Sequence, residues 1–203
     1  MTNKVKETYQ NGIKAIENHQ FKKAIDLFQQ VIHIEPDYSE AYFHLSTASM
    51  AEQAFSEAQT YLDKVIELEP AWPNGYFNAG RVASIQGEFD DAVGFFSVAL
   101  KLGMETEQTL IARGIANHGC GRLADAIDDF DSVLVESIDI TALKYRMACL
   151  LGMHRYQEAL SDINVLIELQ DEDQELFDIR KTCLQQLQNA PIGERIQVTE
   201  LTD

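Results

Sequence analysis

The sequence predicts an all-α solenoid, a row of short helix pairs, and three recurring features predict it. Pro36 and Pro70 end two similar apolar stretches 34 residues apart, and neither fits inside a helix because proline lacks the backbone N–H and clashes with the preceding turn. Small residues recur at the same interval, as do alanines. Each of these alanines has a bulky apolar residue four positions later, on the same face of a helix.

The interval defines five repeats, near residues 5–38, 39–72, 73–106, 107–140 and 141–172. Their eighth residues are all small: Gly12, Ser46, Gly80, Gly114 and Ala148. The twentieth residues of the first four repeats are Ala24, Ala58, Ala92 and Ala126, each followed by Phe28, Leu62, Phe96 or Phe130. Ala159 and Ile163 come one position early in the fifth repeat, which predicts a one-residue deletion in the turn near 152–154.

Each repeat is interpreted as two helices that pack closely where a small residue lets them approach. The stretches "ENHQF", "QGEFD" and "GCGRL" mark turns between paired helices. Residues 173–189 begin with acidic residues and then show an amphipathic pattern, which predicts a capping helix for the solenoid. The solenoid domain therefore spans residues 1–189. Residues 190–203 contain proline and glycine without helical periodicity, and we expect a mobile tail there.

Composition and charge exclude several classes of function. The net charge of −17 disfavours binding to nucleic acid or to anionic membranes. The N-terminal stretch has no apolar segment typical of a secretory signal, and no apolar run is long enough to span a bilayer, so we expect a cytoplasmic location. The three cysteines and five histidines show no ligand spacing, and no residues form a catalytic motif. We therefore expect no enzyme activity, cofactor or metal.

The pattern resembles the tetratricopeptide repeat (TPR) family over residues 5 to about 172. The second repeat carries the motif residues Tyr42, Leu45, Ala58, Leu62 and Pro70, and the third carries Tyr76, Gly80, Gly87, Ala92, Phe96 and Ala99. The resemblance implies a right-handed superhelix whose first helices line a concave groove that binds another protein. A carboxylate clamp of the kind found in some TPR cochaperones is not expected, because no basic residue stands at its positions.

The resemblance also implies which residues face the groove, at the second, fifth, ninth, twelfth and thirteenth positions of each repeat. Among these positions only Lys6, Glu17, Glu40 and Arg81 are charged, so the groove should be nearly neutral. Ile16, Ile85 and Met153 are further apolar residues at these positions. The predicted peptide-binding residues are Tyr9, Ile13, Phe43, Thr47, Met50, Phe77, Arg81, Ile111, Ile115, His118, Tyr145 and Cys149.

We therefore predict a non-catalytic adaptor or chaperone-like module that binds an apolar or aromatic peptide segment, or an amphipathic helix, of another protein. Several alternatives remain. The aromatic residues could pack between neighbouring helices, or the acidic outer face could bind basic partners. The chain could also be a structural subunit of a homo-oligomer or of a multiprotein complex, with the groove filled by its own tail through Ile196, Val198 and Leu201.

Overall fold

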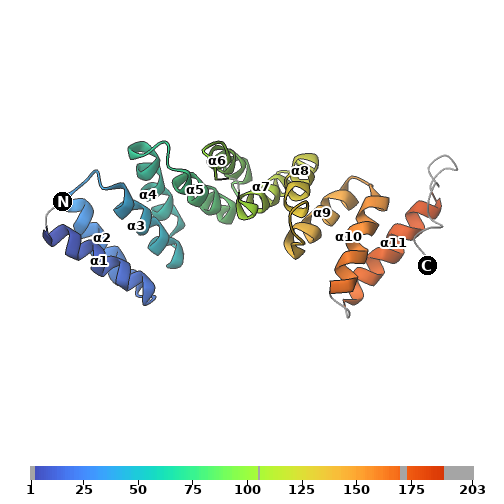
Figure 1. Ribbon diagram of the computed structural model, residues 1–203, viewed down its shortest axis with the longest axis horizontal. Coiled ribbons are helices and arrows are strands. Elements are labelled where there is room, and N and C mark those ends of the chain that lie inside the picture. Colours follow the sequence, from blue (N-terminus) through green and yellow to red (C-terminus); the bar gives the residue numbers. More distant parts are fainter. Residues whose placement is uncertain (1–2, 105, 170–172, 190–203) are drawn as a thin grey trace. The chain divides into compact units, whose positions relative to one another are not determined.

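The computed structural model describes residues 3–104, 106–169 and 173–189, which form eleven helices and no strand (Figure 1). This confirms the all-α prediction. The chain divides into two compact units, Met1–Thr109 and Leu110–Asp203. The helices of unit 1 are α1 (Asn3–Glu17), α2 (Phe21–Ile34), α3 (Ser39–Ala51), α4 (Phe55–Leu68), α5 (Pro73–Gln86) and α6 (Phe89–Lys101). Those lying wholly or mostly in unit 2 are α7 (Glu107–Gly119), α8 (Leu123–Leu134), α9 (Ile140–Gly152), α10 (Tyr156–Leu169) and α11 (Gln174–Asn189).

The two helices of each repeat are joined by the same kind of tight turn. One residue in each turn has a positive φ, and a backbone N–H in the turn donates to a carbonyl five residues earlier, as from Gln20 to Ala15 at 2.8 Å. This is the hydrogen bond of the Schellman motif, which ends a helix in the left-handed region. In the turns within the five repeats, the residues with positive φ are His19, Gln53, Gly87, Gly121 and His154.

Glycine and phenylalanine form the contact that the sequence predicts between the paired helices. A Cβ added to Gly12 would lie 2.7 Å from the ring of Phe28. A Cβ added to Gly80 would lie at the same distance from the ring of Phe96. The fourth repeat has the same 2.7 Å approach between its glycine and phenylalanine. These rings are fully or almost fully buried, so the glycines are needed for the close approach of the helices.

The position of the missing residue differs from the prediction. Helices α7 and α9 begin 33 residues apart, at Glu107 and Ile140, and α8 and α10 also begin 33 residues apart. The deletion therefore lies between the start of α8 and the start of α9, where α8 has 12 residues and α6 has 13, and the prediction of a deletion near 152–154 is wrong. In the corrected register Met147 takes the eighth position instead of Ala148. Met147 is buried in the same core cluster as Ile163.

Helix α11 packs against α10 and covers the end of unit 2. Leu176 and Cys183 on α11 are buried in one cluster with Leu166 of α10. No helix in the described ranges has both the length and the apolar character needed to cross a membrane. The predicted mobile tail, residues 190–203, lies outside the described residues.

Candidate functional site

The predicted peptide-binding residues all lie on the first helices of the repeats. In unit 1 they belong to α1, α3 and α5, and in unit 2 to α7 and α9. Nine of the twelve side chains are half-buried, Arg81 is exposed, and Phe77 and Cys149 are buried. We call the half-buried and exposed group Ile13, Phe43, Thr47, Met50 and Arg81 the unit 1 strip.

Two predicted contact residues lie in the interior instead of on a surface. Phe77 is 7% exposed, and its ring centroid lies 5.7 Å from that of Phe96. Cys149 is fully buried, and burial raises the pKa of its thiol to about 11. The corrected register explains Cys149, because it aligns with the fully buried Ala116 and not with Ile115. Neither side chain offers contact area to a partner.

Tyr9 packs between helices of unit 1. Its ring centroid lies 5.6 Å from Phe28 and 5.1 Å from Tyr38, the residue before α3. Burial is the largest cause that raises the pKa of Tyr9 above its usual value, and the phenolic O–H therefore stays protonated. Half-buried Tyr9 thus contributes mainly to packing.

Tyr145 has a similar place in unit 2. Its ring is stacked 6.0 Å from Phe130 and lies edge-on to His118 at 5.6 Å. Ile111 and Ile115 of α7 pack against the same core cluster as Tyr145, and both stay half-buried. The α7 and α9 residues therefore form a partly exposed apolar surface in which the aromatic ring is largely engaged by its neighbours.

The unit 1 strip is centred on Phe43. The ring centroid of Phe43 lies 4.8 Å from that of Trp72, which directly precedes α5, and both rings are half-buried. The Thr47 hydroxyl donates to the Phe43 carbonyl at 3.0 Å, which satisfies this hydroxyl within α3. Ile85 is 54% exposed and follows Arg81 by one helical turn. Apolar side chains are therefore at least partly exposed on both α3 and α5.

Charge near the strip is low. Arg81 donates to the side-chain oxygen of Asn78 at 3.3 Å, within the same helix. His44 stacks on Phe28 with ring centroids 5.3 Å apart, and burial lowers its pKa, which favours the neutral imidazole. A charged ligand group would lose its hydration here and find few charged partners on the protein. An apolar ligand has no such desolvation cost.

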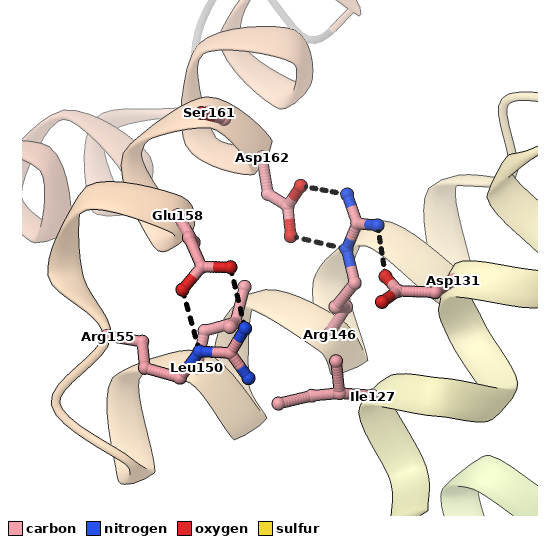
Figure 2. A pocket seen from close by; sticks show the side chains of 8 residues that line it. All are labelled: Ile127, Asp131, Arg146, Leu150, Arg155, Glu158, Ser161 and Asp162. Carbon is pink, nitrogen blue, oxygen red and sulfur yellow. Dashed lines mark hydrogen bonds and ion pairs between the residues drawn. The ribbon is translucent and has the colours of Figure 1, made fainter. Parts of the chain in front are cut away.

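Unit 2 contains a polar pocket that the sequence did not predict (Figure 2). The pocket has a volume of about 300 Å³. Its residues come from α8, α9, α10 and the turn before α10: Ile127, Asp131, Arg146, Leu150, Arg155, Glu158, Ser161 and Asp162. Figure 2 shows Arg146 between the carboxylates of Asp162 and Asp131, with Arg155 paired to Glu158.

Arg146 holds α9 against α10. Its Nε donates to Asp162 Oδ2 at 3.0 Å and its Nη2 to Oδ1 at 2.5 Å, a bidentate pair, while Nη1 donates to Asp131 at 2.5 Å. Asp162 is only 2% exposed, and the hydrogen bond to it is the largest cause that raises the pKa of Arg146. The arginine thus neutralises a buried carboxylate.

The preceding repeat has the same arrangement. Arg113 of α7 forms a bidentate pair with Asp129 of α8, and Asn117 also donates to Asp129 at 3.2 Å. Arg113 and Arg146 stand 33 residues apart, as do the two buried aspartates. This repeated spacing was visible in the sequence and could have revealed both pairs. Each arginine thus compensates a buried carboxylate and joins the two helices of its repeat. In the described part of the chain, no three histidine, cysteine or acidic side chains gather as metal ligands do.

Comparisons with known proteins agree with this architecture. The sequence model of the tetratricopeptide repeat family matches residues 15–79. No curated protein matches the sequence. Many solved structures are similar in fold, and three of them illustrate the likeness. MamA from Desulfovibrio magneticus RS-1 is 15% identical, with 86% of this chain and 99% of that chain covered and a TM-score of 0.79.

The second structure is YrrB, described as a TPR protein with an unusual peptide-binding site. It is 19% identical, with 86% of this chain and 92% of that chain covered and a TM-score of 0.72. The third, a tetratricopeptide repeat protein from Parabacteroides merdae, is 16% identical, with 98% of this chain and 78% of that chain covered and a TM-score of 0.78. At these identities the likeness shows the fold. The family model covers residues 15–79, and similar helix pairs continue beyond them. The chain therefore has the fold of tetratricopeptide repeat proteins.

Proposed function

We propose that the chain is a non-catalytic protein-interaction module whose unit 1 strip binds an apolar segment of another protein. The observation that carries the proposal is the half-buried pair of Phe43 and Trp72, whose ring centroids lie 4.8 Å apart; half-buried Met50 lies two helical turns farther along α3. Arg81 is the one charged member of the strip. Such a surface gains more from contact with apolar side chains than with charged ones.

The chemistry of these side chains fits a peptide ligand. Aromatic rings contribute a large contact area, and methionine adapts its shape to irregular partners. Exposed Ile85 would extend the same contact along α5. An extended segment, or the apolar face of an amphipathic helix, can place alternate or i, i+4 side chains on such a strip. Peptide binding by YrrB, a protein of the same fold, supports a ligand of this class.

Binding measurements on strip variants test the proposal. A ligand is first selected from a displayed library of random peptides on the full chain. Phe43→Ala should weaken the selected peptide by about 2 kcal/mol or more, roughly thirtyfold, because central aromatic residues dominate binding energy. Phe89→Ala is the matched control, since half-buried Phe89 begins the second helix α6 and should leave affinity unchanged. Circular dichroism confirms that both variants stay folded.

The dependence of binding on salt distinguishes the alternatives. Contact with the strip should change little in affinity when salt is raised, because apolar burial is not screened. A steep loss of affinity at high salt, with Phe43→Ala binding normally, would contradict the proposal and favour a basic partner on the acidic surface. Deletion of residues 190–203 tests the tail alternative. If the tail occupies the strip, its removal should increase peptide affinity or change the molecular mass measured by sedimentation.

A further inference from the structure

The connection between α8 and α9 carries the largest concentration of exposed apolar side chains among the described residues of unit 2. Val135 is 80% exposed, Ile138 is 69% exposed and Ile140 is 40% exposed, all within six residues. We call these three residues the α8–α9 corner. Large apolar side chains gathered in this way on a surface mark interaction sites more often than single exposed ones do.

Hydrogen bonds fix the backbone of this corner. The N–H groups of Glu136 and Ser137 both donate to the Val133 carbonyl, at 3.2 and 3.3 Å. Asp139 is the N-cap of α9, and its Oδ1 accepts from the Ala142 N–H at 2.7 Å. The exposed side chains thus stand on a backbone that is held at both ends, so a partner would not have to order this connection when it binds.

In unit 1 an aromatic residue directly precedes α3 and α5, at the position that Asp139 occupies before α9. The residue directly before α3 is Tyr38 and the one before α5 is Trp72, and neither forms a side-chain cap. Instead, Tyr38 packs on Tyr9 and Trp72 packs on Phe43, at 5.1 and 4.8 Å between ring centroids. At the same place before α9, Asp139 provides a cap but no apolar cover.

The third repeat does not need such a cover. Thr106 directly precedes α7, and its hydroxyl accepts from the Thr109 N–H at 3.2 Å. Phe77 occupies the position of Tyr9 and Phe43 in this repeat, and its ring is already buried against Phe96. The α8–α9 corner differs from these connections because it leaves three large apolar side chains exposed, whereas Leu102 is the one exposed large apolar side chain among the described residues of the α6–α7 connection.

We propose that the α8–α9 corner is a second docking surface, and that it binds a basic, amphipathic segment of another protein. Charge complementarity selects this occupant. Between Leu123 and Ile140 the sequence has six carboxylates and no lysine or arginine. Two of the carboxylates are engaged by Arg113 and Arg146. Exposed Glu136 lies between Val135 and Ile138 in the sequence, and exposed Asp128 lies two helical turns before Val135 on α8.

The same charges disfavour the other occupants. A second copy of the chain also has a net charge of −17, and its approach would be repelled. Anionic lipid would be repelled for the same reason. A segment with leucine-like side chains on one face and lysine or arginine on the other would instead bury its apolar face on Val135 and Ile138, and its cations would lie near the flanking carboxylates.

This inference does not depend on the proposed function of the unit 1 strip. The corner belongs to unit 2, uses different residues and predicts binding that weakens with salt. The corner could fail as a docking surface while the strip still binds its peptide, and the reverse also holds. Variants in the two units therefore separate the two proposals.

The test uses the full chain and two fluorescein-labelled probes. One is a short amphipathic helical peptide composed of leucine and lysine, and the other has glutamate in place of every lysine. Fluorescence anisotropy should show binding of the lysine peptide and none of the glutamate peptide. The double variant Val135→Ser, Ile138→Ser should bind the lysine peptide about tenfold more weakly, because two apolar contacts are lost. Both substitutions lie at exposed positions, so the fold should be retained.

The control is Ile34→Ser, which changes a 48% exposed isoleucine at the end of α2 in unit 1 and should leave affinity unchanged. Equal binding of the lysine peptide by the double variant and the wild-type chain would overturn the proposal, since attraction would then come from charge alone. Loss of binding in Phe43→Ala would overturn it by placing the peptide on the unit 1 strip. Absence of binding to the wild-type chain would overturn it too. So would a sedimenting dimer that the double variant converts to monomer, because the occupant would then be a second copy.

Discussion

Glycine at the eighth position of a repeat sets how closely its two helices pack. At Gly80 an added Cβ would lie 2.7 Å from the buried ring of Phe96. The second repeat has a larger residue at this position, Ser46, and a smaller one opposite, Leu62. The two positions thus share one volume, and an increase on one side is matched by a decrease on the other.

Gly80→Ala should therefore destabilise the chain. The buried ring of Phe96 would have to shift, and overpacking of this kind costs about 1–3 kcal/mol of the free energy of unfolding. Urea unfolding followed by circular dichroism measures the change. Phe96→Leu in addition to Gly80→Ala should recover part of the loss by restoring the combination of small and large side chains seen in the second repeat.

Gly94→Ala is the matched control on α6. Nothing lies within 4 Å of the added Cβ, and Gly94 is exposed, so alanine should raise the free energy of unfolding by about 0.5–1 kcal/mol through its higher helix propensity. If Gly80→Ala stabilised the chain as Gly94→Ala does, the close approach of α5 and α6 would not be as described.

Phe43 and Phe77 differ in burial although they occupy the same position in successive repeats. Periodicity placed Phe43 and Phe77 at the same position of successive repeats and could not separate them. Phe77 faces the large ring of Phe96 and is buried, whereas Phe43 contacts Trp72 and stays half-exposed. The depth of a side chain depends on the partner that it meets across the helix pair, and this partner varies from repeat to repeat.

The arginine–aspartate pairs connect helices. Each joins the first helix of a repeat to its second helix, as Arg146 on α9 joins Asp162 on α10. Because Asp162 is almost fully buried, its charge depends on this arginine for compensation. The pairs are present in the fourth and fifth repeats, where an arginine occupies the position that Leu45 and Ala79 occupy in the second and third.

Arg146→Met should lower the free energy of unfolding by about 3 kcal/mol or more, since a buried carboxylate would lose its bidentate partner. The double variant Arg146→Met, Asp162→Leu should recover most of this loss, because an apolar pair of similar volume avoids the cost of burying charge. Thermal unfolding of the three variants, with Asp162→Leu as the third, gives the coupling between the two positions. Additive effects of the two substitutions would contradict a direct interaction.

The fifth repeat shows how an element can be predicted while its register is not. The alanine and isoleucine of α10 predicted that helix, and small Ala148 suggested where α9 should be aligned. The structure places Met147 there instead, one residue earlier. An unbranched, flexible methionine can fill the contact where Ile163 replaces the larger phenylalanine, so the small-residue rule did not apply.

Charge dominates the properties of the whole molecule. The chain has 33 acidic and 16 basic residues, which gives a net charge of −17. Repulsion among these carboxylates opposes the compact state. The repeat count and the all-α architecture could be predicted from the sequence because they depend on spacing. The pocket around Arg146 could not, because it also needs Asp131, Arg155 and Glu158, which do not belong to the repeated arginine–aspartate spacing.

Moderate salt should therefore raise the temperature of unfolding. An increase in sodium chloride from about 10 mM to about 150 mM shortens the screening distance from about 30 Å to about 8 Å and weakens the repulsion between carboxylates. Differential scanning calorimetry measures the effect, and choline chloride at the same ionic strength controls for specific binding of sodium. An unfolding temperature that fell with salt would mean that favourable ion pairs, such as those of Arg146, outweigh the repulsion.

The single residue missing before α9 has a consequence for protein engineering. The first two helix pairs are followed by connections of equal length, 35–38 and 69–72, so one pair could be grafted in place of the other without altering the junction that follows it. A graft that exchanged the fourth and fifth pairs would instead have to keep the interval from the start of α8 to the start of α9, which is one residue shorter than the interval from α6 to α7.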